Sequence, residues 1–327
     1  PNIDKFARES ANIVNAVSGM PVCTPHRASL LTGQRPLTHG LFMNDVQLDT
    51  AAVTIAEVLA NEGYQTGYIG KWHLDGSGRS AFTPPGPRRQ GFQYWKALEC
   101  SHDYNNSAYY SGDSPEKKFW DGYDALAQAK DAQAYLKAHA KDEKPFFLFL
   151  SWATPHAPYQ TAPKEYIDMY DPEDIILRPN VPVEMQDKAK KSLAGYYAHC
   201  TALDDMLADV LKTLDDMGIR ENTVVMFTSD HGDLLGSHNA FKKQQPYEES
   251  IRVPMLIDHP GIKSGEYKAL INSYDIMPTL LGLTGVDIPR SVEGYDFSKY
   301  LMGQSPLPDT VTMISCVQPF GQWNRFQ

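Results

Sequence analysis

The chain has 327 residues, of which 42% are hydrophobic and 21% charged, the mixture of a globular protein of one large domain or two smaller ones. Its formal net charge of −10 argues against a nucleic-acid-coating surface. The longest strongly apolar run, residues 146–150, is far too short to cross a membrane, and the four cysteines are too scattered for a zinc ribbon or a dense disulfide framework.

Helix and strand patterns alternate along the chain. In order, the expected elements are a helix at 54–62, a strand at 64–69, a helix at 127–140, a strand at 145–152, a helix at 186–217, strands at 223–229 and 253–257, and a helix at 275–283. This alternation predicts an α/β fold with a mainly parallel central sheet and helices on both faces. Residues 76–122 and 158–184 are expected to form long excursions from the sheet.

Chemically capable side chains follow the first three expected strands. Lys71 and His73 follow the first strand, His156 the second, and Asp230 and His231 the third. In open α/β sheets, ligands bind outside the carboxyl ends of the strands. We therefore expect these side chains at one sheet edge, in an active site.

Each of these residues also has a structural explanation when it is taken alone. Lys71 and His73 would suit a solvated loop, His156 a turn between two prolines, and Asp230 a helix N-cap. Their joint placement at strand ends favours the functional interpretation. Asp233 is expected to be a structural group rather than a ligand.

The sharpest local pattern is CTPHRASLLTG, which begins at Cys23. Thr24 suits an N-cap, Pro25 the first helical position and Gly33 the C-terminal stop. Cys23 would then lie just before a helix N-terminus, where the dipole favours negative charge, and Arg27 could point back toward it. The pattern predicts an anion site, although a buried structural cysteine beside a surface arginine would also fit its first five residues.

This motif resembles the signature of the type I sulfatases of the alkaline phosphatase superfamily, in which that cysteine is oxidised to formylglycine by a dedicated enzyme. GKWHL, which contains Lys71 and His73, looks like the second signature of the family. His156 in TPHAP is similar to its central histidine, and DHGD at Asp230 to its distal metal segment. The resemblance covers nearly the whole chain, from residue 1 to about 301.

The resemblance implies a set of active-site roles. The implied catalytic residues are Cys23 as the formylglycine nucleophile, Arg27 to orient its hydrate, His73 to act on its hydroxyl during elimination and His156 to assist departure of the alcohol. The implied sulfate-binding residues are Lys71 and Lys243, of which the second has Lys242 as a neighbour that could take its place. The implied metal ligands are Asp230, His231 and the group at position 23. Calcium is the usual ion of the family, and one imidazole ligand leaves magnesium or manganese open.

Several polar residues and one cysteine lie outside these motifs. His102 or Tyr104, in the first long excursion, is expected to touch the organic part of the substrate, although both would suit a packed loop. His26 and His238 are expected to be variable loop residues. Cys200 lies on the core face of a long helix and is expected to be a buried small hydrophobe.

The leading expectation is a sulfuric-ester hydrolase that acts on a sulfated saccharide and has a formylglycine-generating enzyme as its maturation partner. One alternative is a hydrolase of phosphonate monoesters or phosphodiesters from the same superfamily. Another is a non-catalytic relative that binds sulfated glycans. A periplasmic or secreted location would follow from a polysaccharide substrate.

One departure from the family pattern affects the expected metal shell. Family members begin with a hydrophobic strand that ends in two metal-binding aspartates, and PNIDKFA at Pro1 resembles the segment directly after that strand. We therefore expect a catalytic domain at 1–305 without its first strand, the start of a C-terminal subdomain at 306–327, and a longer parent enzyme.

Overall fold

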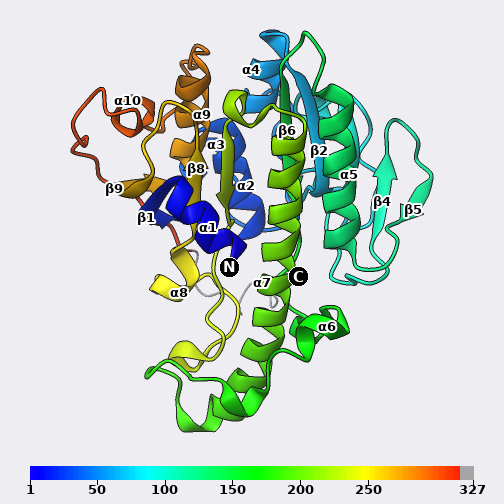
Figure 1. Ribbon diagram of the computed structural model, residues 1–327, viewed down its shortest axis with the longest axis vertical. Coiled ribbons are helices and arrows are strands. Elements are labelled where there is room, and N and C mark those ends of the chain that lie inside the picture. Colours follow the sequence, from blue (N-terminus) through cyan, green and yellow to red (C-terminus); the bar gives the residue numbers. More distant parts are fainter. Residues whose placement is uncertain (317–327) are drawn as a thin grey trace. The chain divides into compact units, whose positions relative to one another are not determined.

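The computed structural model describes residues 1–316, which divide into two compact units (Figure 1). The first, here called the Lys71 unit, comprises residues 1–5, 56–223 and 235–241. The second, the Cys23 unit, comprises residues 6–55, 224–234 and the chain from 242 onward. Each unit contains its own sheet, and helix α1 (Asn2–Glu9) crosses the boundary between them.

The Lys71 unit has a sheet of strand order β5-β4-β3-β2-β6. Its strands are β2 (Gln65–Lys71), β3 (Tyr94–Leu98), β4 (Ala108–Ser111), β5 (Lys117–Phe119) and β6 (Phe146–Ser151). β2 runs parallel to both β3 and β6, whereas β4 is antiparallel to its two neighbours. Gly70 lies opposite Ser151, so β2 and β6 end side by side.

The helices of this unit are α4 (Ile55–Asn61), which begins at the unit boundary, α5 (Asp124–His139), α6 (Lys164–Ile167) and α7 (Gln186–Asp216). Of these, α5 packs on β2 and β6. In Figure 1, α5 runs alongside β2 and β6, with α7 beside it. The buried residues Ala125, Ala129, Ala132 and Leu136 recur every three or four positions, which gives α5 the apolar face that it packs inward.

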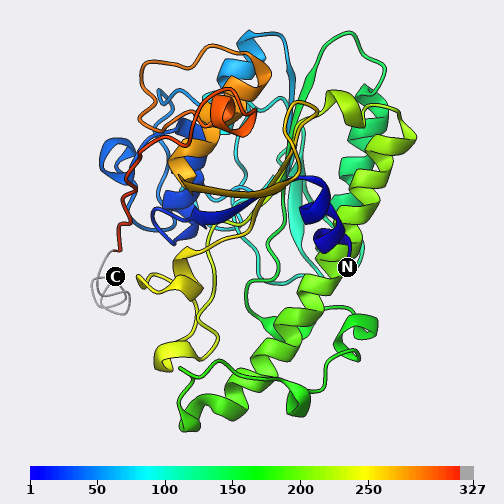
Figure 2. The ribbon, with the colours of Figure 1, turned by 60° about the vertical axis from the view of Figure 1, so that its left-hand side comes forward.

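The Cys23 unit has a sheet of strand order β7-β8-β1-β9. Its strands are β1 (Ala11–Val17), β7 (Val225–Thr228), β8 (Met255–Asp258) and β9 (Gly265–Asn272). β1 is parallel to β9 and antiparallel to β8, which in turn is antiparallel to β7. Figure 2 shows β1 and β9 side by side. The helices of this unit are α2 (Cys23–Thr32), α3 (Pro36–His39), α8 (Glu248–Ile251), α9 (Ile276–Thr284) and α10 (Ser298–Leu301).

The structure confirms the α/β class and corrects the sheet arrangement. All eight expected elements are present, with ends within three residues of those expected. The described strands form two mixed sheets, not one mainly parallel sheet. β8 is antiparallel to its neighbours in one sheet, and β4 is antiparallel to its neighbours in the other. The excursion at 76–122 contains β3, β4 and β5, which Gly, Pro and aromatic residues concealed. None of the described helices has the length and apolar character that crossing a bilayer requires.

The end of the described chain contacts the Cys23 unit. The Asn272 side chain donates to Thr312 Oγ1 and to the Met313 carbonyl, and the Ser315 amide donates to the Gly19 carbonyl. Residues 317–327 of the expected subdomain lie outside the described residues, so a boundary at 305 stays a prediction.

Gly70 is required at the end of β2. Its φ is +105°, and a Cβ at this position would lie 2.1 Å from the Ser151 carbonyl oxygen. We expect Gly70→Ala to lower the free energy of unfolding by about 3 kcal/mol, since backbone strain and a backbone clash each cost roughly 1–3 kcal/mol. Urea unfolding measures this effect.

Gly63→Ala is the matched control, because Gly63 also has a positive φ, +88°, but a Cβ there would meet nothing within 4 Å. Only strain remains, so a loss of about 1 kcal/mol is expected. Equal losses for the two variants would contradict the close approach at Gly70.

Candidate active site

Helix α2 begins at Cys23 itself. The N-cap is Val22, in an extended conformation with φ −145° and ψ 138°, so the predicted N-cap role of Thr24 is wrong and Pro25 lies two positions further into the helix than expected. The Thr24 amide is satisfied by the Asn44 side-chain oxygen at 3.0 Å, a distant partner that sequence spacing does not reveal. Gly33 ends the helix as predicted, with φ +64°.

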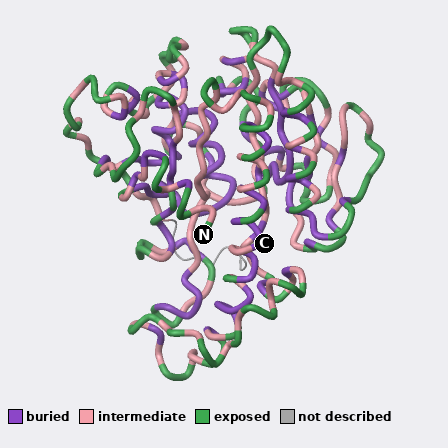
Figure 3. The backbone as a smooth tube through the Cα atoms, viewed as in Figure 1, coloured by how far each residue is buried: buried purple, intermediate pink, exposed green. Residues whose placement is uncertain are grey.

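All ten residues of α2 are buried (Figure 3). The helix has no amphipathic pattern, which agrees with burial on every side. It packs against α3, α9 and the 3₁₀ turn Ser273–Asp275, all in the Cys23 unit. A helix that is buried all round holds its side chains in fixed rotamers. The Cys23 side chain therefore has a fixed position at the helix N-terminus.

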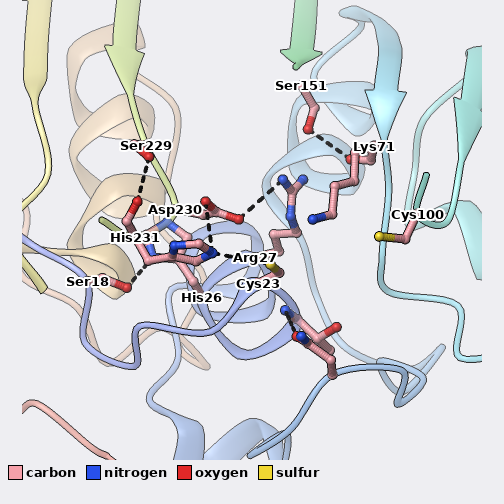
Figure 4. Close-up of polar contacts among 12 residues, drawn as sticks. Ser18, Cys23, His26, Arg27, Lys71, Cys100, Ser151, Ser229, Asp230 and His231 are labelled. Atoms are coloured by element: carbon pink, nitrogen blue, oxygen red, sulfur yellow. Dashed lines mark hydrogen bonds and ion pairs between the residues drawn. The ribbon is translucent and has the colours of Figure 1, made fainter. Parts of the chain in front are cut away.

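Cys23 and Arg27 converge with Asp230 and His231, which follow β7 (Figure 4). Cys23 Sγ lies 3.3 Å from His231 Nε2, and His231 Nε2 lies 3.6 Å from Asp230 Oδ1. Arg27 Nη2 lies 3.4 Å from Asp230 Oδ2. Residues 23 and 27 share a helix face because they are four apart, which lets both reach the end of β7.

The donor atoms of this cluster suit a divalent cation. His231 Nδ1 donates to the Gly232 carbonyl at 2.8 Å, so in the neutral ring the proton is on Nδ1 and Nε2 presents a lone pair. One atom each from Cys23, Asp230 and His231 lies within 4.8 Å of the others. Ligand atoms lie about 2.0–2.6 Å from a bound divalent ion, so two ligands of one ion lie roughly 3–5 Å apart. The spacing fits three members of a metal shell.

His26 belongs to the same helix face and is not a variable loop residue, contrary to the prediction. It is 1% exposed, and burial, the main cause, lowers its pKa to about 4. The Ser18 hydroxyl donates to the Met20 carbonyl at 3.1 Å, so at 2.9 Å it accepts from His26 Nδ1. His26 Nε2 has no hydrogen-bond partner among the described residues. Its spacing of three from Cys23 was the sequence signal for this placement.

Lys243 is also in the Cys23 unit and is 6% exposed. The preceding loop is closed by Asp233, whose Oδ1 accepts the Lys242 amide at 2.8 Å, and by the Leu234 amide, which donates to the Lys242 carbonyl at 2.7 Å. Asp233 therefore has the structural role that was predicted for it.

Lys71 and His73 lie at the carboxyl end of β2 in the Lys71 unit. Both are buried, with 5% and 2% exposure. The Ser151 hydroxyl donates to the Lys71 carbonyl at 2.8 Å, which ties the ends of β2 and β6 together. His73 has a positive φ of +59°, which is rare outside glycine and marks a tight turn directly after the strand.

His156 lies in the same unit, where its ring stacks on His102 with centroids 4.6 Å apart. Tyr104 is fully buried next to this pair, and its hydroxyl donates to the carbonyls of His156 and Ala157 at 2.7 and 3.1 Å. Tyr104 therefore holds the His156 segment. The substrate contact expected of His102 or Tyr104 stays a prediction.

The structure thus places the predicted site residues in two groups. The Cys23 unit holds Cys23, Arg27, Asp230, His231 and Lys243, and the Lys71 unit holds Lys71, His73, His102, Tyr104 and His156. His238 forms a surface contact with Asn180, as expected of a loop residue. Sequence reasoning missed the buried Glu99, because β3, the strand that it follows, was itself not predicted.

Comparison with known proteins gives consistent matches over most of the chain. A family model described as Sulfatase matches residues 1–286. The chain is 50% identical over 325 residues to an ulvan-active sulfatase of Formosa agariphila, a match that covers 98% of this chain and 63% of that protein. It is 33% identical over 336 residues to an endo-4-O-sulfatase of Bacteroides thetaiotaomicron, with 91% and 65% covered. The chain thus spans less than two thirds of these two relatives.

Solved structures agree with these matches. A sulfatase from Bacteroides fragilis superposes with a TM-score of 0.88 at 31% identity, covering 93% of this chain and 73% of that one. A phosphonate monoester hydrolase from Silicibacter pomeroyi superposes with a TM-score of 0.78 at 22% identity, covering 95% and 73%. The second match is evidence for a shared fold alone.

Proposed function

Because the chain belongs to the sulfatase family, as its Cys23 motif predicted, we propose that it is the catalytic part of an enzyme that hydrolyses sulfate monoesters. The observation that carries the proposal is the cluster at the start of α2. There the motif cysteine lies 3.3 Å from a histidine lone pair, and an aspartate and an arginine complete the group.

A sulfate monoester needs a strong nucleophile, because its negatively charged oxygens repel anionic attack. Cys23 converted to formylglycine meets this need, since the hydrated aldehyde offers one hydroxyl to attack sulfur and a second whose deprotonation releases sulfate. Arg27 orients this group from the next turn of the helix. His73 takes the proton of the second hydroxyl, and His156 protonates the departing alcohol oxygen.

Positive charge is the second requirement. Lys71 and Lys243 bind the non-bridging sulfate oxygens. Asp230, His231 and the group at position 23 would hold a divalent ion, which would supply further positive charge to stabilise anionic oxygens. Calcium suits the carboxylate, and magnesium or manganese is compatible with the imidazole.

The proposed substrate class is a sulfated saccharide, with His102 beside its sugar. Support comes from two relatives, one named an ulvan-active sulfatase and the other an endo-4-O-sulfatase, and from the stacked rings of His102 and His156. A polysaccharide substrate would place the enzyme in the periplasm or outside the cell. A formylglycine-generating enzyme would be its partner during maturation.

The mass of the proteolytic peptide that contains Cys23 tests the proposed nucleophile. The full-length protein would be produced in a host with a formylglycine-generating system, and a mass that matches thiol-to-aldehyde conversion is expected. An unmodified thiol, in a host that converts a control sulfatase, would favour a non-catalytic glycan-binding protein instead.

Substrate preference separates the proposal from the phosphonate and phosphodiester alternative. On one preparation, kcat/KM for an aryl sulfate is expected to exceed that for an aryl phosphodiester by at least about tenfold. The two lysines and the metal ion would bind three non-bridging oxygens, and a phosphodiester has only two. A reversed ratio would assign the enzyme to the phosphonate hydrolases.

A further inference from the structure

The turn that carries His73 is held by a buried carboxylate, Glu99. Glu99 follows β3 directly and is 2% exposed. Its two oxygens accept backbone amides from Leu74 at 3.3 Å, from Asp75 at 3.0 and 3.1 Å, and from Gly76 at 3.1 Å. A buried carboxylate with three amide donors is a strong fixed anchor, because each hydrogen bond is charge-assisted.

The position of Glu99 is itself fixed on both sides. The carbonyl of Leu98 accepts the Trp72 amide at 2.8 Å, which extends the β2–β3 ladder by one residue. The Cys100 amide donates to the Arg79 carbonyl at 3.0 Å. The backbone at Glu99 is therefore fixed to the sheet, independently of the turn at residues 73–76.

The turn also contains a carboxylate of its own, Asp75, which does not bind these amides. Asp75 forms a bidentate ion pair with Arg88, at 2.5 and 2.7 Å, and also accepts from the Ser77 hydroxyl. Burial raises the pKa of Glu99, and its bonds to the Asp75 and Gly76 amides oppose that rise. Asp75 ties the turn to the following loop, and Glu99 ties it to the sheet.

His73 lies between the last β2–β3 hydrogen bond, at Trp72, and the three amides that Glu99 binds. It has a left-handed conformation, which costs about 1–3 kcal/mol outside glycine. Such a conformation persists only when its surroundings enforce it. We propose that Glu99 is a positioning residue for His73, which it fixes by binding the amides of residues 74–76. The inference rests on the proposed role of His73 in sulfate release.

Replacing Glu99 separates this role from simple stability. In Glu99→Ala the amides of residues 74–76 lose their acceptor, so their hydrogen exchange is expected to accelerate. The turnover number kcat is expected to fall by about ten- to hundredfold, the usual cost of losing an outer partner of a site. KM is expected to change less than about twofold, because the Lys71 backbone stays tied to Ser151.

Two further variants complete the experiment. Glu99→Gln keeps one acceptor oxygen at nearly the same volume, and is expected to retain part of both the amide protection and kcat even if Glu99→Ala fails to fold. Glu116→Gln makes the same chemical change at an exposed position of the same unit and is expected to leave exchange, kcat and KM unchanged.

Wild-type protection of residues 74–76 in a folded Glu99→Ala or Glu99→Gln variant would overturn the proposal, as would lost protection with unchanged kcat. If the wild type had no sulfatase turnover at all, the proposed function would fail instead. The exchange measurement would still report on the turn.

Discussion

Turnover of the Cys23→Ala variant is expected to fall by at least ~10⁴-fold, to the level of the background reaction. Alanine cannot become an aldehyde, so the nucleophile itself is lost, and removing a catalytic nucleophile can cost about 10⁶-fold in turnover. The measurement is aryl sulfate hydrolysis by the full-length protein from a converting host. Residual activity within about tenfold of the wild type would show that another group attacks sulfur.

Cys200→Ala is the matched control. Burial raises the pKa of the Cys200 thiol to about 12, so this cysteine is not a thiolate at neutral pH. It lies in α7 of the Lys71 unit, and its replacement is expected to leave kcat unchanged. Together the two variants test whether activity depends on the one cysteine at the start of α2.

The second large effect is expected for Asp230→Asn. This change removes the carboxylate charge that lies 3.6 Å from the His231 lone pair and 3.4 Å from Arg27. Metal affinity is expected to fall by at least about 100-fold, more than the usual loss when only an outer partner of a ligand is changed. Metal content by mass spectrometry and a calcium-dependent shift in Tm both report this without an activity assay.

Asp287→Asn, at an exposed position of the same unit, is the control and is expected to bind metal like the wild type. Chelation of the wild type should reproduce the loss, and added calcium should restore it. Full metal occupancy in Asp230→Asn would remove Asp230 from the ligand set.

The sequence predicted helix and strand identity well, because apolar periodicity reports how a segment is buried. It predicted the partners of the strands less well. β7 has the same apolar run as a strand of a parallel sheet, yet its hydrogen bonds go to the antiparallel β8. β3 to β5 escaped prediction because the Gly-rich and Pro-rich segments around them look like loops.

The site was predicted unevenly for a similar reason. The Cys23 motif and the strand-end positions of Lys71, His156 and Asp230 are local patterns, so the chain itself reveals them. The burial of His26 and Tyr104 depends on contacts between segments that are distant in sequence, such as that of Tyr104 with the His156 carbonyl. The N-cap is likewise Val22 and not Thr24 as predicted, and the Thr24 amide donates to the distant Asn44 side chain.

The complete burial of α2 has a consequence for the order of events during biosynthesis. Cys23 is 2% exposed and starts a helix with no exposed residue, so a modifying enzyme has no access to an extended strand of this motif once the unit has folded. The proposed conversion to formylglycine would therefore have to come before α2 docks, while the segment is still unstructured. A molecule that folds first would keep its thiol. The active fraction of a preparation would then depend on the rate of modification relative to the rate of folding.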